Sequence, residues 1–212
     1  MTNVLEPHVY DKSVFINCPF DSAYEPLFHA LIFAVHHMNL VPRSALDPSD
    51  TGQPRFDKIL ALIESCKYSI HDISRTEVDP NHGLPRFNVP FELGLDLGCK
   101  RYGKRPHKQK TTLILDVERY RYRTFISDIA GFDIEEHNGS VAKVITLVRN
   151  WLRHASDSIP FEAPSGATIY TRYQGFQLDL PKTCYDMNWD VENLPFADFS
   201  WAAYDWIKNN PL

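Results

Sequence analysis

Cysteine is scarce in this sequence and long apolar runs are missing, and both features narrow the class of protein. The four cysteines stand far apart and form no C-x-x-C pair, unlike the dense pattern of small disulfide-bonded secreted domains. No stretch approaches the roughly 18 consecutive apolar residues that indicate a membrane-spanning helix. The first residues lack the basic and apolar regions of a signal peptide. We therefore expect reduced thiols, no membrane span and a cytoplasmic location.

Several motifs of metal and covalent catalysis are missing as well. The chain contains no H-E-x-x-H zinc motif, no phosphate-binding P-loop and no G-x-S-x-G nucleophile motif. His36 and His37 are adjacent, so they would face different directions on a helix and could not share a metal ion. The net charge of −5 gives no general attraction for nucleic acid. We expect neither a metal nor a resident cofactor.

Apolar patterns predict alternating strands and helices over residues 1–155, in a chain of 212 residues. Such alternation is typical of an α/β fold, here a doubly wound, flavodoxin-like parallel sheet of about five strands. The expected strands are 14–17, 40–45, 67–73, 111–116 and 132–135, and the expected helices are 27–38, 56–66, 90–98 and 141–152.

Residues 156–212 differ in composition, because proline and aromatic residues become frequent there. The alternating pattern of 167–180 predicts a hairpin or strand pair, and 195–209 predicts a short helix. A segment of about 55 residues makes a marginal core alone, so we interpret it as an appendage rather than an independent domain. Its aromatic residues should pack on the main domain or on a neighbouring copy.

The candidate ligand site lies at the carboxyl ends of the predicted strands. Open parallel sheets bind ligands beyond that edge, where the strand order reverses. The candidate residues there follow the first and third strands or stand in the loop before the next helix. They are Asn17, Pro19, Asp21, Asp72, Ser74, Arg75, Arg86 and Asn88.

Glu92 is the candidate catalytic residue. A residue before proline avoids helical geometry, so Val89 is the expected N-cap and Pro90 the first helical residue. Glu92 is then third, where a glutamate often only caps the helix, and this alternative stays open. The helix dipole should keep its carboxylate ionised. An ionised carboxylate in a cleft suits a nucleophile, or a stabiliser of an oxocarbenium ion, better than a proton donor.

Two segments resemble the nucleoside 2-deoxyribosyltransferase family. VFINCPF at 14–20 is similar to its first strand and turn, and RFNVPFELGLDLGCKRYGK at 86–104 to its segment with the catalytic glutamate. The layout also resembles the wider TIR-like group of Rossmann-type domains, and the likeness covers about residues 12–150. It implies that Glu92 is the nucleophile, that Asp72 orients the substrate and that the protein is oligomeric. For Asp72 the alternative of a loop-start aspartate that bonds nearby backbone amides stays open.

Two positions depart from the pattern of that family. Phe15 stands where the family often has a tyrosine, and Arg86 where it commonly has an aspartate. An arginine can hold a phosphate with two parallel hydrogen bonds. The expected substrate is therefore a nucleotide, or a dinucleotide such as NAD, rather than a free nucleoside. The alternative, that Arg86 is only a solvated loop residue, stays open.

The sequence leaves two functions open. The first is cleavage or transfer of an N-glycosidic bond on such a substrate. The resemblance implies that such an enzyme could be an effector of bacterial anti-phage defence. The alternative is a non-catalytic subunit that senses a nucleotide or binds a protein partner in a larger assembly. The basic run Lys100–Lys110 is expected to be a solvated connector, and contact with nucleic acid is the less favoured role for it.

Overall fold

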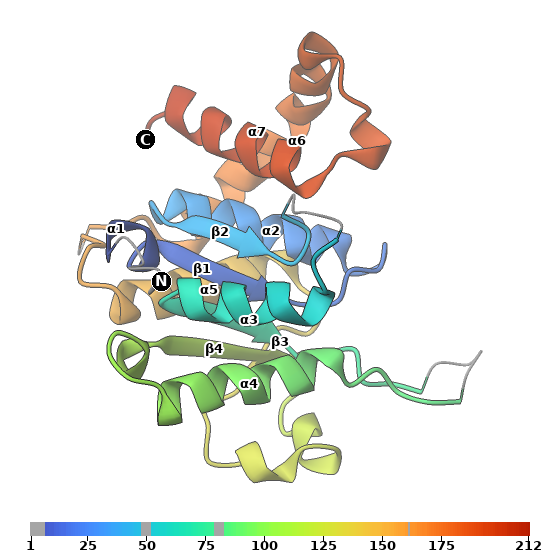
Figure 1. Ribbon diagram of the computed structural model, residues 1–212. Helices are drawn as coiled ribbons and strands as arrows, with labels where there is room; N and C mark the ends of the chain where they lie inside the picture. The colour runs from blue at the N-terminus through green and yellow to red at the C-terminus, as the bar shows by residue number, and fades with distance from the viewer. Residues whose placement is uncertain (1–6, 48–51, 79–82, 161) are drawn as a thin grey trace.

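The protein is an α/β fold built on one parallel sheet (Figure 1). The computed structural model describes residues 7–47, 52–78, 83–160 and 162–212. The five strands are all parallel and lie in the order β2-β1-β3-β4-β5. This is the predicted doubly wound, flavodoxin-like order, which is confirmed. The strands are β1 (Ser13–Asn17), β2 (Val41–Ser44), β3 (Tyr68–Asp72), β4 (Thr111–Asp116) and β5 (Glu135–Glu136).

Helices cover both faces of the sheet. Side chains alternate along β1, so Val14 and Ile16 pack in the core with α2 (Glu25–His37) and α5 (Val141–Ala155). Phe15, between them, packs on the opposite face with α3 (Arg55–Ser65). α4 (Asn88–Tyr102) covers β3 and β4 on that same face. Short elements complete the chain: α1 (Pro7–Tyr10), η1 (His107–Gln109), η2 (Arg121–Thr124), η3 (Ser127–Ile129) and η4 (Val191–Asn193).

The C-terminal segment is helical, and the predicted hairpin at 167–180 is wrong. α6 (Gly166–Met187) spans it, followed by α7 (Phe196–Asn209), the expected terminal helix. Buried residues of α6 recur at helical spacing, at Ile169, Tyr173, Phe176, Leu180 and Cys184. Over a short stretch, the same apolar residues fit both the two-residue period of a strand and the 3.6-residue period of a helix. Burial of one face of the helix decides in favour of the helix.

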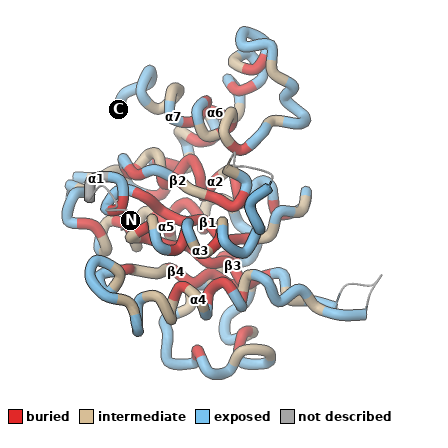
Figure 2. Tube along the Cα trace, in the orientation of Figure 1, coloured by how far each residue is buried: buried red, intermediate tan, exposed pale blue. Residues whose placement is uncertain are grey.

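α6 and α7 form a further layer, outside α2. Phe33 of α2 lies 5.3 Å from both Tyr173 and Phe176 and 6.0 Å from Trp206, between ring centroids. α2 is therefore buried along most of its length between the sheet and the C-terminal helices, and much of this helix is red in Figure 2. The segment shares the hydrophobic core of the main domain instead of forming its own.

Smaller points concern the last strand, which differs from the prediction, and the cysteines, which are free as expected. β5 has two residues and begins later in the chain than the expected strand 132–135. Phe132, the expected first residue of that strand, lies in the preceding loop and is 47% exposed. The four cysteines are free. Among the described residues, no helix is long and apolar enough to cross a membrane. Two predicted segments lie outside the described residues. They are residues 1–6 at the N-terminus and residues 79–82 of the predicted loop.

Candidate active site

A pocket of about 520 Å³ opens at the carboxyl edge of the sheet, next to the ends of β1 and β3. The strand order reverses between these two strands, which is where parallel sheets commonly bind ligands. The volume is within the usual range for small-molecule sites. Its walls come from the turn after β1, the start of α3, the loop after β3 and the first turn of α4. The lining residues include Asn17, Pro19, Phe20, Asp21, Arg55, Arg75, Glu77, Val78, Arg86, Asn88, Val89 and Glu92.

Most of the predicted site residues line this pocket, but Asp72 and Ser74 do not. Both are buried, with 0% and 4% exposure. Because side chains alternate along β3, Asp72 points to the face covered by α2 and His71 to the face covered by α4. The expectation that Asp72 shares a cleft with Glu92 is therefore wrong.

The carboxylate of Asp72 is instead an internal anchor. Its Oδ2 accepts a hydrogen bond from the hydroxyl of Tyr24 at 2.5 Å, and its Oδ1 accepts one from the amide of Ser74 at 2.9 Å. Nε2 of His137 lies 3.1 Å from Oδ2. These contacts fasten the loop after β3 and the chain before α2 to the sheet, and they occupy both carboxylate oxygens of Asp72.

Glu92 lines the pocket while only 8% of its surface is exposed. α4 begins at Asn88, with Phe87 as N-cap, so Glu92 is its fifth residue rather than its third. Burial raises the pKa of its carboxyl, and the positive charge of Arg55, the electrostatic contact with the His71 ring and a hydrogen bond from Asn17 oppose that shift. Burial therefore outweighs the dipole effect expected from the sequence. A raised pKa brings proton exchange by Glu92 closer to neutral pH.

A buried relay connects Glu92 to the floor of the sheet. The side-chain amide of Asn17, which hydrogen-bonds Glu92, also donates to Nδ1 of His71 at 3.0 Å. Because an amide nitrogen only donates, Nδ1 accepts, and Nε2 carries the proton toward Oδ2 of Asp96 at 3.2 Å. The relay fixes which way the amide of Asn17 faces, and so presents its N–H to Glu92.

Asp96 anchors the far end of the relay. Ser69 and Thr112 donate to its Oδ2 at 2.5 Å and 3.1 Å, and Nζ of Lys110 lies 3.0 Å from Oδ1. Burial alone would raise the pKa of Asp96, but its contacts with His71, Lys110 and Ser69 hold that pKa well below the usual range. Asp96 therefore stays ionised beneath the pocket.

Sequence reasoning missed this relay and misplaced Lys110. Lys110 is 1% exposed, and its ammonium also donates to the carbonyls of Ile63 and Cys66, so it is no part of a solvated connector. Lys100 and Arg101 belong to the last turn of α4. Two patterns in the sequence could have indicated the relay. Ser69 and His71 are polar residues at alternate positions of β3, and the carboxylates at 92 and 96 are one helical turn apart in α4.

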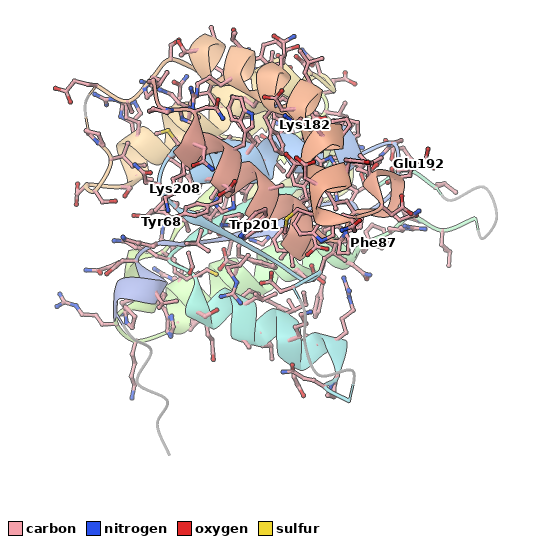
Figure 3. The ribbon with its side chains drawn as sticks, turned by 90° about the horizontal axis from the view of Figure 1, so that it is seen from above. Tyr68, Phe87, Lys182, Glu192, Trp201 and Lys208 are labelled. Carbon is pink, nitrogen blue, oxygen red and sulfur yellow. The ribbon has the colours of Figure 1, made fainter. Side chains whose placement is uncertain are left out.

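Three arginines surround the pocket, on different elements. Arg55 begins α3, Arg75 follows β3, and Arg86 precedes α4, and all three are exposed. Arg75 lies 3.4 Å from a carboxylate oxygen of Asp21. A guanidinium offers five donors in a fixed fork, so this rim suits a ligand with phosphate or carboxylate groups. Phe87, labelled in Figure 3, follows Arg86 in the chain, is the N-cap of α4 and is 53% exposed.

No protein-family model, curated protein or solved structure matches this chain. The resemblance to the deoxyribosyltransferase and TIR-like families therefore stays a prediction, and the function has to be argued from the site.

Proposed function

We propose that this protein cleaves or transfers an N-glycosidic bond of a nucleotide or NAD-type substrate, with Glu92 as the reacting carboxylate. The observation that carries the proposal is the pairing of one mostly buried carboxylate with an arginine rim in a single pocket. Glu92 meets the sugar and the rim holds phosphate. Asp72, the second catalytic residue that the resemblance implied, has no part in this scheme.

The chemistry requires one negative group at the anomeric carbon. As the bond from that carbon to the base breaks, the electron pair leaves with the base. A purine or pyrimidine then takes a proton from solvent, whereas the pyridinium base of NAD leaves neutral without one. Glu92 stabilises the positive charge on the sugar, or attacks it to form an ester. Water or a second base then adds to the anomeric carbon. The amide of Asn17, fixed by His71, holds the carboxylate of Glu92 in one orientation.

The pH dependence follows from the raised pKa of Glu92. A nucleophile or charge stabiliser acts only when ionised, so the rate should rise with pH through the pKa of Glu92. That rise should come at a higher pH than for an ordinary glutamate, because burial disfavours the charged form. A rate profile measured from acid to neutral pH checks this expectation.

The direct experiment is to incubate the purified chain with NAD, deoxynucleoside monophosphates and nucleosides, and to look for free base by chromatography. Glu92→Gln should abolish base release and keep the melting temperature, since the amide has the same shape and can still bond to Asn17. Glu64→Gln is the matched control, because Glu64 is exposed in the last turn of α3, away from the pocket.

Two outcomes would contradict the proposal. Equal turnover by wild type and Glu92→Gln would remove Glu92 from the chemistry. Binding of a nucleotide without release of base would favour the alternative of a sensing or interaction subunit.

A further inference from the structure

A second groove follows the open edge of β4, away from the pocket. β5 pairs only with Leu115 and Asp116, so within the described residues no strand lies beside positions 111–114 on that side. Figure 1 shows β4 as the last long strand at this margin of the sheet. A groove of about 740 Å³ lies between this edge and α4. Its lining includes Gly94, Leu97, Gly98, Thr112, Ile114 and Phe132.

The backbone at this edge is directed toward a further strand. The amide of Thr111 donates to the carbonyl of Lys67 at 3.0 Å, on the β3 side. Backbone groups of a strand alternate in direction, so the N–H and C=O of Thr112 face the opposite side, toward the groove. An edge of this kind is a template for an added strand from another chain.

Two glycines keep the groove open. Gly94 and Gly98 lie one turn apart in α4, and a Cβ added to either would meet nothing within 4 Å. Packing within the described chain therefore does not require glycine there, although each costs about 1 kcal/mol relative to alanine inside a helix. Bare positions on a helix allow the close approach of another backbone.

The charge of the groove selects the partner. Lys100, Arg101 and Lys108 line it and no carboxylate does. Among the described residues, none of these three cations forms an ion pair with a carboxylate. The chain as a whole carries a net charge of −5, so this is a local reversal of sign. Oppositely charged groups across an interface favour encounter and fix register.

We propose that this groove binds an acidic, extended segment of a partner protein, which adds as a strand to β4. The backbone of the segment pairs with Thr112 and passes the bare face of α4 at Gly94 and Gly98. Its carboxylates meet the three cations of the groove.

The test uses the full chain and a labelled short peptide of alternating glutamate and valine, followed by fluorescence anisotropy. The peptide should bind, and a version with lysine in place of glutamate should bind at least about tenfold more weakly. Gly98→Leu fills the groove and should abolish binding, while its better helix propensity keeps the fold intact, as the melting temperature would show. Arg101→Glu should weaken binding about tenfold. Lys182→Glu, on the distant α6 (Figure 3), is the matched control and should change nothing.

Hydrogen exchange locates the contact. The amide of Thr112 should exchange more slowly when the peptide is bound, and that of Thr111, already paired with β3, should not change. Absence of peptide binding, unchanged binding by Gly98→Leu, or an unprotected Thr112 amide would overturn the proposal. Tighter binding of single-stranded oligothymidylate than of the acidic peptide would also overturn it, since the cations would then serve a nucleic acid.

Discussion

Mild acid should weaken the attachment of the C-terminal helices, and His29 of α2 is the cleanest place to test it. Its ring stacks on Phe199 of α7, with centroids 3.7 Å apart and an angle of 10° between the planes. Burial lowers the pKa of His29 to about 4 from its usual 6.5. A charged imidazole is therefore disfavoured in this interface.

The sign and size follow from proton linkage. The unfolded chain binds the proton of His29 below about pH 6.5, while the folded chain resists it until about pH 4. The contribution of His29 to the free energy of unfolding is complete above about pH 6.5, the pKa of the unfolded chain, and is lost as the pH falls toward about 4, the pKa of the folded chain. Between about pH 7 and about pH 5, these two values give a loss of about 2 kcal/mol from His29.

The assay is urea unfolding of wild type and His29→Phe at both pH values. Phenylalanine keeps the stack on Phe199 but cannot titrate, so the variant should lose about 2 kcal/mol less on acidification. His36 and His37, which bond to Ser200 and Arg172, titrate in both proteins, so their contribution cancels in the difference. His154→Phe, at an exposed site, is the control. Equal pH dependence of wild type and His29→Phe would refute the reasoning.

The remaining predictions concern the relay, the anchor and the arginine rim. Lys110→Met should cost about 3–5 kcal/mol in urea unfolding, because it leaves Asp96 charged and buried, and adding Asp96→Asn should recover part of the loss. Asp72→Ala should cost about 2 kcal/mol by the same measurement but leave nucleotide affinity unchanged, and a large loss of affinity would restore the role that the resemblance implied. Arg86→Ala should remove most of the roughly tenfold to hundredfold advantage of a nucleoside monophosphate over its nucleoside in calorimetry, and equal binding of both ligands by wild type would contradict the phosphate site.

Much of the sheet could be predicted because its strands are short apolar runs between helices with one apolar stripe. Val14–Asn17 and Thr111–Asp116 are of this kind, and both were expected where they occur. β5 could not be placed, because two glutamates carry no apolar signal. α6 was missed for a different reason: over 167–180 its apolar residues fit both a strand and a helix, and contact with α2 decides between them.

The part of the site that could be predicted consists of residues that directly follow the ends of strands or begin the next helix. The turn after β1 and the start of α4 had to meet at one edge, and Asn17, Asp21 and Glu92 do line one pocket there. The misplacement of Asp72 has a simple cause. A shift of one residue along a strand reverses the face to which a side chain points, and position in the chain alone does not fix the face.

The charges around Glu92 restrict where a ligand phosphate can lie. Arg55 is the arginine of the rim whose charge opposes the effect of burial on the pKa of Glu92. A phosphate paired with Arg55 would cancel its charge and promote protonation of Glu92, which disables a nucleophile. A phosphate paired with Arg86 and Arg75 leaves Arg55 free to keep Glu92 ionised. In the proposed reaction, the productive orientation of a nucleotide would therefore direct its phosphate to the β3–α4 side of the pocket, and its sugar to Glu92 and Asn17.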